Sequence, residues 1–270
     1  MTEIEILRRD LPRGRFRFVL FDFDGTLSLI REGWPQVMIP MMVEVLRATG
    51  TTEEDATLTA HVEEFVMRLN GRQTIYQMIH LAEEVQKRGG QPLEPLAYKH
   101  EYHARLMGRI QGRLDALASE QAAPEDWTVP GSHAMLGRLR ERGMKLYLAS
   151  GTDIAFVKRE AELLGLTNFF GAHIYGALDD YQSFSKKMIV ERILKENNLK
   201  GDELLGFGDG FVEIEEVKRV GGVAVAVASD EVKREGIHAW KRDRLVRAGA
   251  DVVIGDYRCI DPLMELLFTV

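Results

Sequence analysis

The stretch that decides the fold is Phe16-Arg17-Phe18-Val19-Leu20-Phe21-Asp22-Phe23-Asp24-Gly25-Thr26. Its apolar first half predicts a buried strand, and two aspartates follow where that strand should end. Asp-Gly alone is a common turn dipeptide, but Asp22 lies inside the apolar run, and a buried carboxylate needs a cation or hydrogen-bond donors. Side chains in a strand alternate faces, so Asp22 and Asp24 can point the same way. A hard divalent ion with oxygen ligands supplies that compensation, and we expect Mg²⁺.

Composition is that of an ordinary soluble protein of 270 residues, with 45% hydrophobic and 29% charged residues. The formal net charge of -7 and the absence of a basic stripe speak against a nucleic-acid partner. The single cysteine, Cys259, fits a reducing compartment, and the first residues do not resemble a secretory signal. The longest run of small apolar residues, Val220 to Ala228, is too short to span a bilayer. We therefore expect a cytoplasmic protein with no membrane partner, as a monomer or homodimer.

The chain changes its pattern twice. Residues 30–121 show helical periodicity, with amphipathic helices expected over Thr52–Asn70 and Thr74–Arg88 and a third beginning at Pro95. From Ser132 onward, strands and helices alternate, which is typical of a parallel sheet covered by helices on both faces. The sequence thus predicts an α/β protein: a Rossmann-like, doubly wound parallel sheet with an inserted all-helical domain. Residues 1–29 and 122–270 form the predicted core, and residues 30–121 form the predicted insertion.

Two more polar segments follow predicted strands, and ligands of such sheets bind beyond the carboxyl ends of the strands. Ser150-Gly151-Thr152 follows the strand Lys145–Ala149 and is expected to open a helix, where backbone N–H groups form a seat for anions. Simple capping of that helix by Ser150 or Thr152 is the alternative, and both roles can hold together. Gly208-Asp209-Gly210 ends a later strand, and Glu213 in the next helical turn can approach the same centre. The glycines there do not match a dinucleotide-binding loop, so a metal-ligand role fits better.

Lys186 and Lys187 occupy the expected first turn of a helix, where a cation is slightly disfavoured unless an anion lies nearby. At least one of the pair should be ordinary solvated surface.

The four segments, in this order, resemble the haloacid dehalogenase superfamily phosphatases that carry a helical cap inserted after the first strand, such as the phosphoglycolate phosphatase and β-phosphoglucomutase group. The resemblance extends from about Arg17 to about Tyr257. It implies that Asp22 is the nucleophile that accepts the phosphoryl group and that Asp24 is the general acid and base. It also implies that Lys186 neutralises charge on the nucleophile and the phosphate.

The same resemblance implies a phosphate seat at Ser150 and Gly151, and Mg²⁺ held by Asp22, the main-chain carbonyl of Asp24, and Asp209. Glu213 stands where the family often has aspartate. It can reach the metal directly, reach it through water, or contact Lys186. The usual proline after the motif lysine is absent, so Lys187 stays an alternative to Lys186. Dehalogenases of the superfamily lack an acid at the position of Asp24, so its presence favours phosphate chemistry.

These expectations combine into a Mg²⁺-dependent phosphatase that acts on a small phosphorylated metabolite through an aspartyl-phosphate. A phosphomutase with the same core is the nearest alternative, and a non-catalytic binding or regulatory protein is the alternative of another class. Arg72, in the connection between two helices of the cap, is a candidate for substrate specificity. An ordinary helix end followed by solvated residues explains Gly71 and Arg72 about as well. Hinges for cap movement are expected near residues 28–33 and 121–131.

Overall fold

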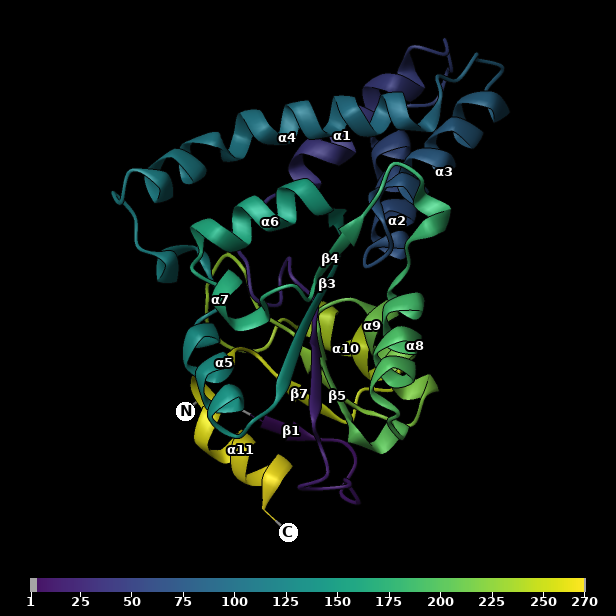
Figure 1. Ribbon diagram of the computed structural model, residues 1–270. Helices are drawn as coiled ribbons and strands as arrows, with labels where there is room; N and C mark the ends of the chain where they lie inside the picture. Colours follow the sequence, from purple (N-terminus) through teal and green to yellow (C-terminus); the bar gives the residue numbers. More distant parts are fainter. Residues whose placement is uncertain (1–3, 270) are drawn as a thin grey trace. The chain divides into compact units, whose positions relative to one another are not determined.

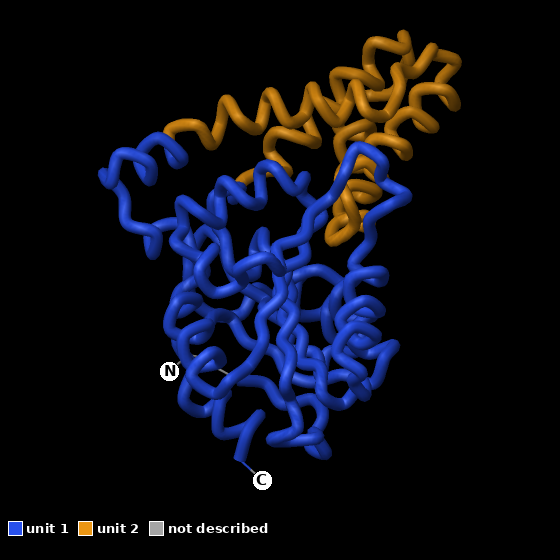
Figure 2. Tube along the Cα trace, viewed as in Figure 1, with its two compact units in different colours: residues 1–32, 113–270 blue, residues 33–112 orange. Residues whose placement is uncertain are grey.

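The computed structural model describes residues 4–269. The chain divides into two compact units, Met1–Glu32 with Arg113–Val270 (unit 1) and Gly33–Gly112 (unit 2), drawn in different colours in Figure 2. Among the described residues, no helix is both long enough and apolar enough to cross a membrane.

Unit 1 is built on a seven-stranded sheet in the order β1-β7-β6-β5-β2-β3-β4, in which only β1 runs antiparallel to its neighbour (Figure 1). The strands are β1 (Ile4–Ile6), β2 (Phe18–Phe21), β3 (Lys145–Asp153), β4 (Ile174–Ala177), β5 (Leu204–Gly208), β6 (Val223–Val227) and β7 (Val252–Ile254).

Strand β2 lies at the centre, between β3 and β5, and its last residue sets the edge of the site. Phe21 pairs with Leu148 of β3 and with Phe207 of β5, so the carboxyl ends of the three strands lie side by side. From β2 the chain first builds outward through β3 and β4, and later returns to the other side of β2 with β5. Ligands of open α/β sheets bind where the strand order reverses in this way, which is between β2 and β5 here.

Alternation along β2 explains how it is buried on both faces. Phe18 and Leu20 belong to a core that includes residues of the helices α8 (Lys186–Asn197), α9 (Phe211–Arg219) and α10 (Ala239–Arg247). Phe21 contacts Phe170 and Tyr257, which are outside that core. Helices α8, α9 and α10 pack on the sheet and on one another, and α7 packs on β3 and α5.

The helices of unit 1 are α5 (Ser132–Glu141), α6 (Ile154–Leu163), α7 (Thr167–Phe170), α8 (Lys186–Asn197), α9 (Phe211–Arg219), α10 (Ala239–Arg247) and α11 (Ile260–Phe268). Short 3₁₀ turns lie at Pro124–Trp127, Tyr181–Ser183, Gly201–Glu203 and Tyr257–Cys259.

Unit 2 contains helices and no strand within Gly33–Gly112. The helices are α1 (Pro35–Arg47), α2 (Asp55–Leu69), α3 (Thr74–Lys87) and α4 (Pro95–Ala118), whose last turns belong to unit 1. The apolar stripes of α1, α2 and α3 form its core, and Met38, Met41 and Met42 are among the buried side chains.

The predicted fold class is confirmed, with two differences in detail. The edge strand β1 was not predicted, because its three residues become a strand only through pairing with β7. Unit 2 is also narrower than the predicted insertion of 30–121. The Arg113 side chain donates to the carbonyls of Ile30 and Glu32 and stacks on Trp127, which explains why the end of α4 belongs to unit 1. A separate role of the helical unit as a cap stays a prediction.

Candidate active site

Asp22 follows β2 directly and is held at the sheet edge by its own backbone, because its N–H donates to the carbonyl of Phe207 (2.9 Å). Its side chain is buried, and Lys186 Nζ lies 2.9 Å from Oδ1. Burial raises the pKa of Asp22 well above its ordinary value; Lys186 opposes this shift, and the charges of Glu213 and Asp209 add to it. The carboxylate is therefore costly to ionise here without further positive charge.

Asp24 has different surroundings. Thr152 Oγ1 donates to its Oδ2 (2.8 Å), and Ser150 Oγ lies 3.4 Å from the same oxygen. The other oxygen, Oδ1, is buried without a hydrogen-bond partner among the described residues, and Arg31 Nε lies 3.8 Å from it. Gly25 follows with a φ of +73°, and a Cβ there would collide with the Asp209 carboxylate, so the turn requires glycine.

The two lysines of the helix start are clearly separated. Ser185 caps α8 by accepting from the Met188 N–H (3.1 Å), and Lys186 in the first turn is buried. Burial disfavours the Lys186 ammonium, but the charges of Asp22 and Glu213 outweigh it and raise the pKa of the lysine. Lys187 is exposed. Of the two candidates, the structure therefore brings only Lys186 to Asp22.

Glu213 lies in the first turn of α9 and is also buried. Its Oε1 accepts from the Gly210 N–H, and its Oε2 accepts from Lys186 Nζ (2.7 Å). The sequence left open whether Glu213 reaches the metal or contacts Lys186, and the contact with Lys186 is present.

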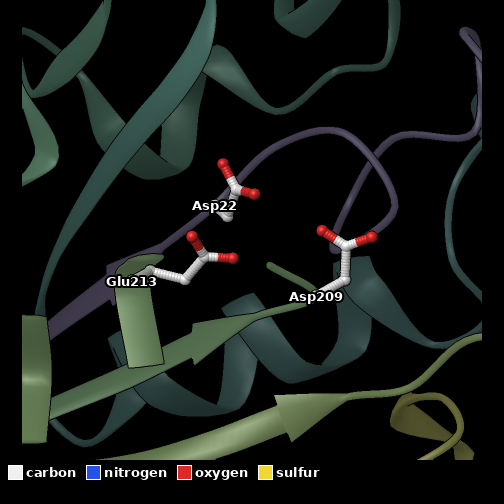
Figure 3. A group of neighbouring side chains, drawn as sticks. All are labelled: Asp22, Asp209 and Glu213. Atoms are coloured by element: carbon white, nitrogen blue, oxygen red, sulfur yellow. The ribbon is translucent and has the colours of Figure 1, made fainter. Parts of the chain in front are cut away.

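Asp22, Asp209 and Glu213 together form a three-carboxylate cluster (Figure 3). One oxygen from each lies within 4.8 Å of the others. Burial raises the pKa of Asp209 to about 6; the charge of Lys241 opposes that shift, and Glu231 and Glu213 reinforce it. Buried carboxylates this close repel one another, and a hard divalent cation with oxygen ligands relieves that repulsion. The donor set fits a hard divalent cation, and Mg²⁺ as the particular ion stays a prediction.

The helix expected after Ser150-Gly151-Thr152 is present, but the strand before it is longer than predicted. Strand β3 continues through these residues to Asp153, which pairs with Ala177 of β4 past an irregularity in the register, and α6 begins only at Ile154. Neither Ser150 nor Thr152 caps that helix. Ser150 Oγ instead accepts from the Thr152 N–H (3.0 Å), and both hydroxyls face Asp24.

The sequence did not reveal three ion pairs, which involve Arg31 and Lys241. Arg31 and Glu160 form a buried ion pair, with Arg31 Nη2 2.7 Å from Glu160 Oε1, and burial raises the pKa of Glu160 against the effect of Arg31. Lys241 contacts Asp209 (2.8 Å) and Glu231 (2.6 Å). No spacing rule connects these residues in the sequence.

Arg72, in unit 2, is exposed in the connection between α2 and α3, and its guanidinium lies 5.9 Å from the centre of the Tyr76 ring. Gly71 before it has a φ of +94°, so a glycine is needed there for the backbone alone.

The family model for haloacid dehalogenase-like hydrolases matches residues 16–221. No curated protein sequence matches the chain.

Several solved structures share the fold. A hydrolase from Pseudomonas syringae has 19% identity and a TM-score of 0.58, with 92% of this chain and 98% of that chain covered. A predicted phosphoglycolate phosphatase from Haemophilus somnus has 16% identity and a TM-score of 0.57, with the same coverage. A β-phosphoglucomutase from Clostridium difficile has 13% identity and a TM-score of 0.53, covering 86% of this chain and 98% of that one.

Proposed function

Because the chain belongs to the haloacid dehalogenase-like hydrolase family, we propose that it is a Mg²⁺-dependent phosphatase of a small phosphorylated metabolite. The observation that carries the proposal is the contrast between Asp22 and Asp24. Asp22 is paired with Lys186, and Asp24 is hydrogen-bonded by Thr152. Two carboxylates whose surroundings differ in this way can take different parts in one reaction.

In the proposed reaction, a carboxylate oxygen of Asp22 attacks the phosphorus of the substrate, and the bond from phosphorus to the leaving oxygen breaks. Asp24, in its acid form, gives a proton to that leaving oxygen. Asp24 then takes a proton from water as the water attacks the phosphorus of the aspartyl-phosphate, which returns free Asp22 and releases inorganic phosphate. The nucleophilic role and the acid and base role are thus divided between two carboxylates.

Lys186 would stabilise the charge on Asp22 and on the transferring phosphoryl group. The Ser150 hydroxyl and the backbone of Gly151 would bind a phosphoryl oxygen at the end of β3. Such fixed donors stabilise the charge that develops during phosphoryl transfer.

Asp22, Asp209 and the main-chain carbonyl of Asp24 would hold the Mg²⁺, with Glu213 as a further candidate. When bound, the ion supplies positive charge to the phosphoryl oxygens. The three-carboxylate cluster supports this part of the proposal, since its oxygens are close enough for one ion.

Substrate choice would depend on unit 2, with Arg72 as the residue that contacts a polar or anionic part of the substrate. Arg72→Ala should lower kcat/KM for the true substrate and spare a small aryl phosphate. Arg68→Ala is the matched control, because Arg68 is also exposed on this unit but pairs with Glu64. Equal losses on both substrates in Arg72→Ala would count against the role.

A screen of phosphorylated metabolites with Mg²⁺ tests the proposal as a whole. Inorganic phosphate should appear with wild-type protein, stop when the metal is chelated, and be absent in Asp22→Asn. Phosphate release from a single substrate also separates a phosphatase from a phosphomutase, which transfers the phosphoryl group to a sugar hydroxyl instead of water. Equal release by the wild type and Asp22→Asn across the screen would refute an enzymatic role.

A further inference from the structure

Lys241 is a buried cation that the proposed reaction does not use. It lies in the first turn of α10, and its ammonium is surrounded by three oxygens of unit 1. Asp209 Oδ2 lies 2.8 Å from Nζ, Glu231 Oε1 lies 2.6 Å from it, and Ser229 Oγ lies 3.3 Å from it. An ammonium has three N–H donors, and each of these has an acceptor here.

The surroundings of Lys241 are those of a buried cation and differ from those of a solvated surface lysine. The first turn of a helix disfavours positive charge, and Lys241 is 8% exposed. Burial alone would lower the pKa of this lysine, but the charges of Asp209 and Glu231 outweigh burial and raise it. The carboxylates of Asp209 and Glu231, which follow different strands, thus both contact the ammonium of Lys241.

The same contacts fix the turn after Asp24. Ser229 Oγ donates to the carbonyl of Gly25 (2.7 Å), and a Cβ at Gly25 would meet both the Asp209 and the Glu231 carboxylates. Asp209 therefore belongs to two groups of charged side chains. It is part of the three-carboxylate cluster, and it also contacts Lys241, which pairs with Glu231.

We propose that Lys241 is a resident cation that positions Asp209 and takes the place of a second metal ion. A carboxylate that bridges two cations is the usual arrangement of two-metal sites. Here the ammonium permanently occupies one of the two positions. It holds Oδ2 of Asp209, and Asp209 would remain a ligand of the catalytic ion. The protein should then bind one divalent ion and should not respond to K⁺ or Na⁺.

Removal of the lysine side chain should open that position to an ion from solution. The number of sites can be measured without any substrate by titration with Mn²⁺. The electron paramagnetic resonance signal of the free ion decreases as Mn²⁺ binds to the protein. We expect about one Mn²⁺ per chain in the wild type and about two in Lys241→Ala. The double variant Lys241→Ala/Glu231→Gln should return to about one, because it lacks a carboxylate of the second position.

Lys233→Ala is the matched control, since Lys233 pairs with Asp230 nearby but is exposed. It should bind Mn²⁺ as the wild type does. Turnover of Lys241→Ala should become dependent on K⁺, whereas that of the wild type should not. A lysine with only a packing role would produce neither the additional ion nor the K⁺ dependence.

The inference depends on the proposed function only through the shared Asp209, and the two can fail separately. Asp22→Asn/Lys241→Ala lacks a ligand of the catalytic ion but keeps the three oxygens around Lys241, so it should still bind the additional ion. If the wild-type protein binds no Mn²⁺ and Lys241→Ala binds one Mn²⁺, the catalytic metal site is refuted and the role of Lys241 is supported. A Lys241→Ala variant with no more sites than the wild type would overturn the inference. Two sites in the wild type would overturn it as well, even if the variant does not fold.

Discussion

Lys186 Nζ lies 2.9 Å from Oδ1 of Asp22, and Lys186 Nζ also lies 2.7 Å from Oε2 of Glu213. One buried ammonium therefore connects the end of β2 with the start of α9. Lys186→Met should keep most of the packing but lose this charge. We expect kcat/KM to fall by a factor of about 10² to 10³, the range seen when a fixed group that stabilises a developing negative charge is removed.

Lys187→Met is the control for that experiment, because Lys187 is on the same helical turn but exposed. Its activity should match the wild type. Equal losses of kcat/KM in the two variants would show that the substitution of Lys186 acts through helix α8 and not on the reaction.

Thr152 should matter through its hydrogen bond to Oδ2 of Asp24 (2.8 Å). Thr152→Val removes that hydroxyl with little change in shape. We expect kcat to fall by a factor of about 10 while KM changes little, because the bond orients the acid and base group and does not bind the substrate. Steady-state kinetics with an aryl phosphate measures this, and a change confined to KM would contradict it.

The Arg31–Glu160 pair offers a test of stability separate from activity. Glu160→Gln removes the carboxylate that lies 2.7 Å from the buried guanidinium of Arg31, so the free energy of unfolding should fall by about 3 kcal/mol. The double variant Arg31→Leu/Glu160→Leu removes both charges and should regain much of that stability. It should not regain turnover, because Asp24 loses the positive group 3.8 Å from its Oδ1.

Denaturant unfolding of the single and double variants measures this difference. The exposed pair Arg192 and Glu196 is the control, and its removal should cost about 0.5 kcal/mol or less. A double variant less stable than Glu160→Gln would contradict the account.

Glu84 makes the stability of the protein dependent on pH. Burial disfavours its charge, but hydrogen bonds from Lys87, Arg88 and His61 outweigh burial and lower the pKa to about 2. A lowered carboxyl pKa contributes stability above the unfolded pKa, here 4.5, and that contribution is lost as the pH falls toward 2. Glu84→Gln should therefore destabilise the protein by about 1 to 3 kcal/mol at pH 7 and by progressively less below pH 4.5.

Unfolding free energies across this pH range check the prediction. Glu83→Gln is the matched control on the same helix, because the Glu83 side chain is more than half exposed. A destabilisation by Glu84→Gln that stays constant with pH would contradict it.

The sequence predicted the parts of the site that depend on local order along the chain. Asp22 follows an apolar run, and Lys186 and Glu213 lie in first helical turns, so their places could be read from strand and helix patterns. Lys241 could not be predicted in this way, because it is 32 residues from Asp209 and reaches it only after β6 and α10 are in place. The pairing of Asp153 with Ala177 also overrode the turn preference of Ser150-Gly151-Thr152 and extended β3.

The proposed reaction requires that Asp22 form a covalent aspartyl-phosphate, which can be trapped chemically. Wild-type protein is quenched with acid during turnover of p-nitrophenyl phosphate, and borohydride then reduces the acyl phosphate to homoserine. Mass spectrometry of the tryptic peptide of residues 18–31 should find homoserine at position 22 and unchanged aspartate at position 24. Homoserine at position 24, or unmodified peptide during active turnover, would contradict the account.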